Sequence, residues 1–418
     1  MLLDNMRRRV VVTGLGVISP VGNDLETFWQ ALISGQSGVG PITTFDASAF
    51  DSKIAGEVKG FDPVRYMDAK EAKRMEKFVQ YAVFASKQAM VDAGLDLTRE
   101  DCNRIGVLVG SGIGSLRIVE EQCRVYFEKG PSRFSPFMIP MLIVNEAAGW
   151  VSITLGVKGP NSCVTTACAS GSHAIGDAFR IVSYGDAEIM FAGGTESCVT
   201  ALGIGGFCAL KALSRRNDAP QKASRPFDKL RDGFVMAEGA GIVVLESLEH
   251  ALKRNARIYA EIIGYGMSAD AYHMTAPDST GDGAMRAMQS ALADGNLKPE
   301  EIDYINAHGT STILNDKIET LAIKKTFGKH AYKLAVNSTK SMTGHLLGAG
   351  GGVEFIVLCL SIYHSQLHPT INQEVPDPDC DLDYVPNVSR KMEVNVALSN
   401  SLGFGGHNAT LIAKKFSL

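Results

Sequence analysis

The sequence predicts an α/β layered fold built from two similar halves. Short runs of β-branched residues alternate with helical patterns along the whole chain of 418 residues. A segment around Asp92, followed by a β-rich run and a glycine, has a counterpart around Asp294, about half the chain further on. We therefore expect a duplicated domain, with halves 1–255 and 256–418 and an active site at the seam between them.

The predicted strands are short apolar runs rich in β-branched residues. In chain order they are 9–13, 105–109, 189–192, 242–246, 259–263, 304–306, 334–337, 396–399 and 409–413. Segments with apolar residues at helical spacing lie between them, among them 72–93, 170–182 and 283–293. This alternation favours buried sheets that are covered by helices on their faces.

The composition is that of a globular protein without a charge that would favour polyanions. Hydrophobic residues make up 45% and charged residues 21%, and the formal net charge is −4. This charge gives no reason to expect nucleic acid or an anionic membrane as a partner. The longest apolar run, 355–363, is far shorter than the ~20 residues that cross a bilayer, and residues 1–9 lack a signal peptide's apolar segment. We expect a cytoplasmic protein with no membrane insertion.

Metal and nucleotide sites are not indicated. The eight cysteines include no Cys-x-x-Cys pair and have no histidine at zinc-finger spacing. Gly14-Leu-Gly16 carries Ser19 where a dinucleotide fingerprint needs its third glycine, so we interpret it as a strand-to-loop turn. The run 348–352 lacks the Lys-Ser/Thr of a phosphate loop and predicts close backbone packing at a helix start.

The segment Thr-Ala-Cys168-Ala-Ser-Gly places a thiol between a short strand and a helix. Unpaired N–H groups and the helix dipole at such a junction favour the thiolate. A buried structural cysteine is the alternative, but the small residues around Cys168 permit the sharp turn that exposes a nucleophile. We therefore expect Cys168 to carry covalent chemistry.

Two histidines follow predicted strands later in the chain. His308 lies in Asn-Ala-His-Gly-Thr-Ser-Thr, and His345 ends Lys340-Ser-Met-Thr-Gly-His. Side chains at the carboxyl edge of a sheet are typical of ligand sites. Lys340 and Glu354 could orient a histidine. Without the neighbouring motifs, however, such a lysine and glutamate would be more typical of an ion pair on the surface. Gly-Phe404-Gly-Gly predicts either a simple hairpin turn or a backbone free enough to bring an N–H to a bound oxygen.

Together these four motifs, in this order, resemble the β-ketoacyl-[acyl-carrier-protein] synthases of bacterial type II fatty acid synthesis. The resemblance covers nearly the whole chain. It implies the thiolase-like fold, with two duplicated βα halves in five αβαβα layers, and a homodimer. It also implies a condensation of an acyl chain with malonyl-carrier protein that releases carbon dioxide and needs no cofactor or metal.

The resemblance assigns roles to these motifs. Cys168 would take the acyl group, and the backbone N–H groups of Cys168 and Phe404 would hold the tetrahedral oxyanion. His308 and His345 would stabilise the charge formed when malonyl thioester loses carbon dioxide. Lys340 would hold this site, with Glu354 in its network.

Substrate-binding positions also follow from the resemblance. Thr310 and Thr312 match the hydroxyl pair that grips the pantetheine arm. Ile113 and Phe207 match positions that line the acyl tunnel, and Phe404 matches its gate. Leu402 stands where the family often has another Phe.

The implied partner is acyl carrier protein, which is acidic. Lys70, Lys73 and Arg74 recur at helical spacing and could form a basic docking patch, although acidic residues interleave with them and a solvated helix face is the alternative.

Other functions share part of this pattern. A polyketide ketosynthase subunit would keep the same residues, whereas a noncatalytic partner of the chain-length-factor kind would have lost the nucleophile. A thiolase needs a second cysteine, and a hydrolase would leave the second histidine and Lys340 unexplained.

Overall fold

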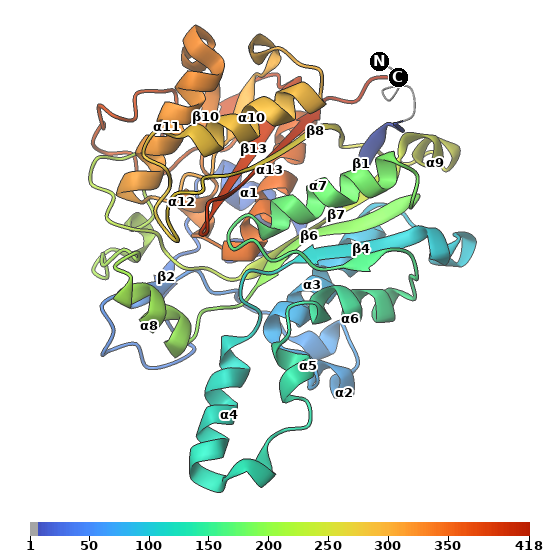
Figure 1. Cartoon of the computed structure of the whole chain (residues 1–418), viewed down its shortest axis with the longest axis vertical. Helices are drawn as coiled ribbons and strands as arrows, with labels where there is room; N and C mark the ends of the chain where they lie inside the picture. The colour runs from blue at the N-terminus through green and yellow to red at the C-terminus, as the bar shows by residue number, and fades with distance from the viewer. Residues whose placement is uncertain (1–6) are drawn as a thin grey trace.

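The computed structural model describes residues 7–418 and contains one ten-stranded sheet (Figure 1). Its strand order is β10-β9-β13-β14-β8-β1-β7-β6-β4-β5. The strands are β1 (Val10–Ile18), β4 (Ile105–Gly110), β5 (Asn161–Ser162), β6 (Ile189–Glu196), β7 (Gly239–Ser247), β8 (Ala260–Ala269), β9 (Tyr304–Asn306), β10 (Ala335–Asn337), β13 (Val396–Gly403) and β14 (His407–Lys414). Small two-stranded sheets pair β2 (Gly40–Pro41) with β3 (Ile54–Ala55) and β11 (Gln366–Leu367) with β12 (Arg390–Lys391).

The two ends of this sheet repeat one topology. From the middle outward, the N-terminal half runs β1-β7-β6-β4-β5 and the C-terminal half runs β8-β14-β13-β9-β10. In both halves the first two pairings are antiparallel and the last two are parallel. The halves meet where β1 and β8 pair antiparallel over three residue pairs. The predicted duplicated α/β fold is confirmed.

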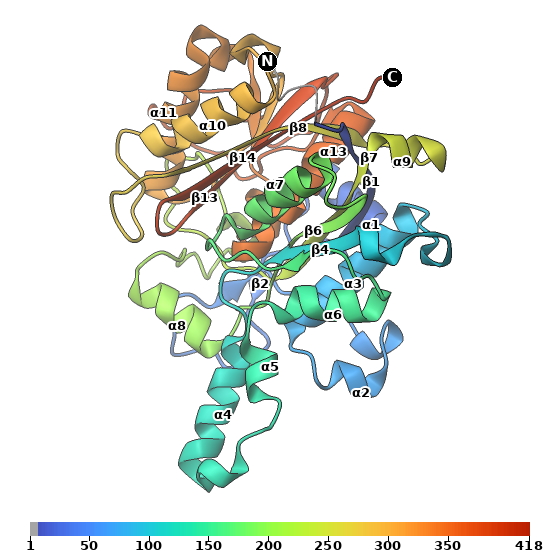
Figure 2. The ribbon, with the colours of Figure 1, turned by 45° about the vertical axis from the view of Figure 1, so that its right-hand side comes forward.

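Helices complete five layers, which Figures 1 and 2 show from two sides. Helices α7 and α13 lie against each other in the central layer, between the two sets of strands, α3 and α6 cover the N-terminal strands, and α10 and α11 cover the C-terminal strands. The α-helices are α1 (Leu25–Ile33), α2 (Ala69–Ala72), α3 (Lys77–Asp92), α4 (Leu116–Lys129), α5 (Met138–Leu142), α6 (Glu146–Leu155), α7 (Ser170–Ser183), α8 (Ala201–Ala209), α9 (Leu248–Lys253), α10 (Asp282–Asp294), α11 (Ile313–Phe327), α12 (Lys340–Thr343) and α13 (Gly350–His364).

The aspartates that revealed the repeat have the same function in both halves. The Asp92 carboxylate accepts the backbone N–H of Leu15 in β1 at 2.9 Å, and the Asp294 carboxylate accepts that of Tyr265 in β8 at 3.0 Å. Each therefore ties the end of an outer helix to the first strand of its half.

Glycine permits a matching close approach beside each aspartate. A Cβ on Gly16 would lie 1.9 Å from the carbonyl oxygen of Ala85, and one on Gly266 would lie 2.1 Å from that of Ala287. Neither separation is physically possible, so each helix can lie this close to its strand only because glycine is there.

Two predicted elements differ from the structure. The predicted turn at Gly14–Gly16 is wrong, because β1 continues through it to Ile18 with its residues buried. The predicted helix 72–93 starts too early, because α2 ends at Ala72, the backbone at Glu76 is extended, and α3 begins only at Lys77. The buried Glu76 carboxylate instead pairs with Arg117 at 2.7 Å.

One segment of the described residues, Leu347–His364, is long and apolar enough to cross a membrane, although its uninterrupted apolar run is short. It includes α13, and 89% of it is buried inside the protein. It is therefore a core helix. The expectation for residues 1–9 concerns mainly residues outside the described range.

Candidate active site

Both halves contribute side chains to one cavity of about 330 Å³. Cys168 comes from the turn before α7, and His308 from the loop after β9. His345 lies between α12 and α13, and Phe404 lies in the turn between β13 and β14. All four line this cavity, as do Phe207, Thr310, Thr312 and Leu402.

Cys168 is 8% exposed and follows Ala167, whose φ of +51° makes the sharp turn into α7. Burial raises the pKa of the Cys168 thiol to about 12, while the Lys340 ammonium and the backbone N–H groups of Phe404 and Cys168 oppose this shift. The sequence suggested a thiolate stabilised by the helix terminus. The structure differs, because desolvation outweighs the dipole in a site this buried.

The two histidines share one tautomer for different reasons. Lys340 Nζ lies 3.3 Å from His308 Nδ1, and since an ammonium only donates, Nδ1 accepts. His345 Nδ1 accepts the backbone N–H of Leu347 at 3.2 Å. In a neutral imidazole the proton is then on Nε2, so both rings carry an N–H donor at the other nitrogen.

Both imidazoles are neutral at physiological pH. Burial lowers the pKa of His308 and His345 well below the usual value, and the Lys340 ammonium lowers both further. The ring centroids lie 5.3 Å apart at an angle of 84°. One cavity therefore holds a thiol and two neutral hydrogen-bond donors.

Lys340 and Glu354 form a buried ion pair with a 2.5 Å separation between Nζ and Oε1. Burial raises the pKa of Glu354 to about 7, and Lys340 opposes that shift. The alternative prediction, an ion pair on the surface, is therefore wrong, because both side chains are almost fully enclosed.

Of the four predicted substrate-binding residues that remain, three line the cavity and one does not. The hydroxyls of Thr310 and Thr312 lie 2.9 Å apart in the cavity wall, and the Phe207 ring centroid lies 6.2 Å from that of Phe404. Ile113 does not line the cavity, but it belongs to the apolar cluster that also contains Cys168 and Phe207.

The predicted docking residues lie on and beside α2. Lys70, Lys73 and Arg74 are all exposed, and the Arg74 guanidinium also lies 5.1 Å from the Phe137 ring centroid. Arg74 is therefore partly engaged within the chain.

Sequence reasoning missed a buried glutamate beside Cys168. Glu196 accepts the backbone N–H groups of Gly112 at 2.8 Å and Gly348 at 3.1 Å, and also the Ser111 hydroxyl. It thereby joins the loop before Ile113 to the loop after His345. Its partners are mostly backbone groups far apart in the chain, and a single sequence carries no signal for them.

Two family descriptions match most of the chain. "Beta-ketoacyl synthase, N-terminal domain" matches residues 7–251, and "Beta-ketoacyl synthase, C-terminal domain" matches residues 259–374. The chain is 58% identical to 3-oxoacyl-[acyl-carrier-protein] synthase 2 of Synechocystis sp., covering 98% of this chain and 99% of that protein. It is 54% identical to the protein of the same name from Coxiella burnetii, with the same coverage.

Solved structures agree in fold. A β-ketoacyl synthase from Burkholderia phymatum is 35% identical with a TM-score of 0.91, covering 98% of this chain and all of that one. A ketosynthase of a type II polyketide synthase, solved with its acyl-carrier protein, is 39% identical with a TM-score of 0.91 and the same coverage.

The chain therefore belongs to the β-ketoacyl synthase family. The high identity over nearly the whole length places it with the 3-oxoacyl-[acyl-carrier-protein] synthases of type 2. It is a condensing enzyme of fatty acid elongation.

Proposed function

We propose that Cys168 carries the growing acyl chain and that His308 and His345 drive the decarboxylation that extends it. The observation behind this proposal is that two neutral imidazoles, each with its proton on Nε2, share one cavity with the thiol. Two such donors suit an oxygen that gains negative charge.

In the first half-reaction the Cys168 sulfur attacks the carbonyl carbon of an acyl-carrier protein thioester. The backbone N–H groups of Cys168 and Phe404 hold the tetrahedral oxyanion. The bond to the carrier's sulfur then breaks, and the thiol proton leaves with the carrier. The acyl group is now a thioester of Cys168.

In the second half-reaction the bond between malonyl carbon 2 and its carboxylate breaks. Carbon dioxide leaves, and the electron pair remains as an enolate whose oxygen accepts hydrogen bonds from His308 and His345 Nε2–H. The enolate carbon attacks the Cys168 thioester, and the Cys168 sulfur departs as a thiolate that takes a proton from water to restore the thiol. The product is a β-ketoacyl-carrier protein that is two carbons longer.

Lys340 and Glu354 keep the imidazole of His308 in its neutral form. The Lys340 ammonium disfavours a second positive charge on His308, which preserves the neutral donor form. Glu354 holds the ammonium within reach of His308 Nδ1. Both residues act through the two imidazoles, since the ammonium also lowers the pKa of His345.

The cavity wall supports the substrate roles. Thr310 and Thr312 present paired hydroxyls to the amides of a pantetheine arm. Phe207 lines the cavity next to Cys168, and Ile113 lies behind it in the same apolar cluster, where the end of an acyl chain would lie. Phe404, on a glycine-rich turn, would move aside when that chain enters.

A sheet edge and a group of exposed apolar side chains support a homodimer, because a second copy of the chain could cover both. Within residues 7–418, strand β5 ends the sheet and pairs on one side only. The α4–α5 excursion, which projects from the body in Figures 1 and 2, exposes Phe127 (82%) and Ile139 (57%), and Ile153 on α6 is 67% exposed. Exposed apolar groups of this size are typical of interfaces.

Three further assignments complete the proposal. Carrier protein would dock through Lys70 and Lys73, with Arg74 beside them. The duplicated halves would comprise residues 1–255 and 256–418. The cytoplasm, where carrier-bound substrates of such enzymes are made, would be its location.

Intact-mass measurement tests the central step. Mixing the protein with dodecanoyl- to hexadecanoyl-carrier protein should add one acyl mass, which malonyl-carrier protein should then remove with release of a β-ketoacyl product. Cys168→Ala should abolish the adduct. Cys208→Ala is the matched control, because that cysteine adjoins Phe207 and should leave the adduct intact. Acylation of the Cys168→Ala protein, or discharge of the adduct by water alone, would contradict the mechanism.

A further inference from the structure

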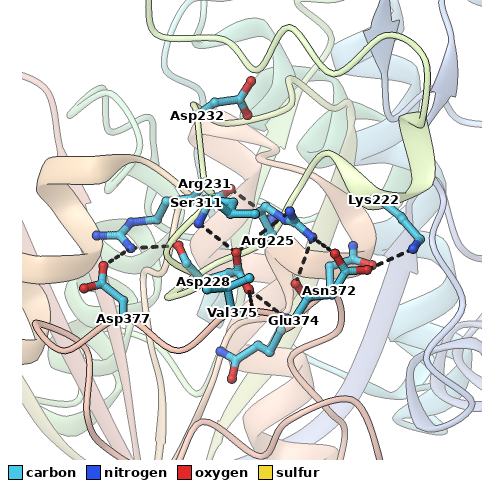
Figure 3. A network of polar contacts seen from close by, with 12 residues as sticks. Lys222, Arg225, Asp228, Arg231, Asp232, Ser311, Asn372, Glu374, Val375 and Asp377 are labelled. Atoms are coloured by element: carbon cyan, nitrogen blue, oxygen red, sulfur yellow. Dashed lines mark hydrogen bonds and ion pairs between the residues drawn. The ribbon is translucent and has the colours of Figure 1, made fainter.

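Two buried arginines lie beside the loop that carries His308, Thr310 and Thr312, and Figure 3 shows both of them next to Ser311 of that loop. They lie in the segment Arg225-Pro-Phe-Asp-Lys-Leu-Arg231, which comes from the N-terminal half. The side chain of Arg225 is fully enclosed, and Arg231 is 5% exposed. Burying a guanidinium group is unfavourable unless its donors are used. Each side-chain nitrogen of Arg231 has a hydrogen-bond partner, whereas Arg225 leaves Nε and Nη1 without one and contacts the loop only through its backbone N–H, so the contacts of Arg231 indicate what this segment does.

Arg231 donates hydrogen bonds to the backbone of the loop that carries Thr310 and Thr312. Its Nε donates to the Thr312 carbonyl at 3.0 Å, and its Nη2 donates to the Ile313 carbonyl at 3.0 Å. These two carbonyls belong to the turn that starts α11. A planar guanidinium can hold two adjacent carbonyls at once, whereas an ammonium acts as a single point.

The guanidinium is itself fixed from the opposite side. Its Nη1 donates to the Asp228 carbonyl at 2.8 Å and to the Asp377 carboxylate at 2.5 Å. Asp228 is held in turn, because its carboxylate accepts the backbone N–H groups of Glu374 and Val375 at 2.7 and 2.6 Å. Arg231 thus joins three segments that are far apart in the chain.

Ser311 shows why the loop needs this support. Its φ of +69° lies in the left-handed region that serine rarely adopts, and this places the Thr310 and Thr312 hydroxyls 2.9 Å apart. Three bonds hold it: its hydroxyl accepts the Arg225 N–H, its carbonyl accepts the Gly233 N–H, and its own N–H donates to Asp316.

We propose that Arg231 is a positioning residue for the pantetheine arm: by holding the Thr312 and Ile313 carbonyls it keeps the threonine pair aligned with the thioester's amides. This inference rests on the proposed role of Thr310 and Thr312. Arg231 does not touch substrate, so it affects how tightly a pantetheine thioester binds and leaves the chemistry at Cys168 unchanged.

The test compares two donors with the same acyl group. One is an acyl-pantetheine, and the other is the acyl ethanethiol thioester, which lacks both amides. Cys168 acylation by each is followed by intact mass over a range of donor concentrations. Arg231→Lys should raise KM for acyl-pantetheine about tenfold, the equivalent of about one lost neutral hydrogen bond between a threonine hydroxyl and a pantetheine amide, with kcat within about twofold. The ethanethiol ester should react about as fast as with the unaltered protein.

Two further variants accompany Arg231→Lys. Arg254→Lys is the matched control, because Arg254 is a largely buried arginine paired with Glu246, and neither lines the cavity. It should change neither donor's kinetics. Asp377→Asn loosens Arg231 without removing it, and should produce the same selective rise in KM if Arg231→Lys does not yield folded protein.

Thr310→Val separates this inference from the proposed function. If Thr310→Val weakens only acyl-pantetheine and the Arg231 and Asp377 variants do not, the positioning role is refuted while the threonine role stands. If Thr310→Val affects both donors equally, the threonine role fails. Equal loss with both donors in Arg231→Lys would make Arg231 merely structural and would overturn the inference.

Discussion

His368 makes the stability of this protein depend on pH in a way that one substitution isolates. The ring is fully enclosed, its Nδ1 lies 2.8 Å from the Pro369 carbonyl, and its Nε2 lies 3.0 Å from the Thr339 hydroxyl. Since a carbonyl only accepts, Nδ1 carries the proton and Nε2 accepts from Thr339. Burial lowers the pKa of His368 from 6.5 to about 4.

The magnitude follows from linkage. Between pH 7 and pH 5 the unfolded chain takes up a proton at residue 368 and the folded protein does not, so acid favours unfolding. A folded pKa of about 4 and an unfolded pKa of 6.5 correspond to a loss of about 2 kcal/mol of folding free energy over this range. The contribution is fully present above pH 7.

The measurement is the free energy of unfolding by urea at pH 7, 6 and 5, for the unaltered protein and for His368→Asn. The asparagine amide can still donate toward the Pro369 carbonyl but cannot titrate. Whatever stability the variant loses at pH 7, its deficit should shrink by about 2 kcal/mol at pH 5. All other titrating groups are common to both proteins and cancel. Parallel pH dependences would refute the assignment of a buried neutral imidazole.

The remaining predictions concern packing, the acyl site and the histidine pair. Gly16→Ala and Gly266→Ala should each lower the free energy of unfolding by about 2 kcal/mol or more, because the new Cβ overlaps a helix carbonyl. Gly206→Ala, within α8 and facing open space, should be neutral or stabilising by up to ~1 kcal/mol in the same urea unfolding measurement, and an equal loss at all three sites would contradict the packing argument. Phe207→Leu should raise kcat/KM for longer acyl-carrier proteins relative to shorter ones, and an unchanged chain-length profile would remove Phe207 from the acyl site. Lys340→Met should raise the pKa of both active-site imidazoles, since the ammonium lowers them, and should move the acid limb of the condensation pH profile to higher pH; an unmoved limb would show that Lys340 does not control their charge.

The sequence predicted those features that have local causes. The turn before α7 could be inferred from the small residues around Cys168, and the hairpin at Phe404 from its three glycines. The repeat was visible because Asp92 and Asp294 sit in similar local sequence. All are consequences of short-range backbone preferences, which a sequence states directly.

Features that depend on distant contacts could not be predicted. The break before α3 follows from the pairing of Glu76 with Arg117, some forty residues further on. The thiol pKa of Cys168 depends on how completely it is enclosed. The contacts of Glu196 and Arg231 cannot be predicted either, because the backbone groups that they bind are present in almost every residue type.

The three residue pairs between β1 and β8 join the two halves into one continuous sheet. Because neighbouring strands are hydrogen-bonded from β5 to β10 in residues 7–418, a movement of one half against the other would have to break the β1–β8 pairing. We therefore expect a substrate as long as an acyl chain to enter through rearranged loops, such as the glycine turn at Phe404. A covalent link between the halves, away from those loops, should leave turnover intact.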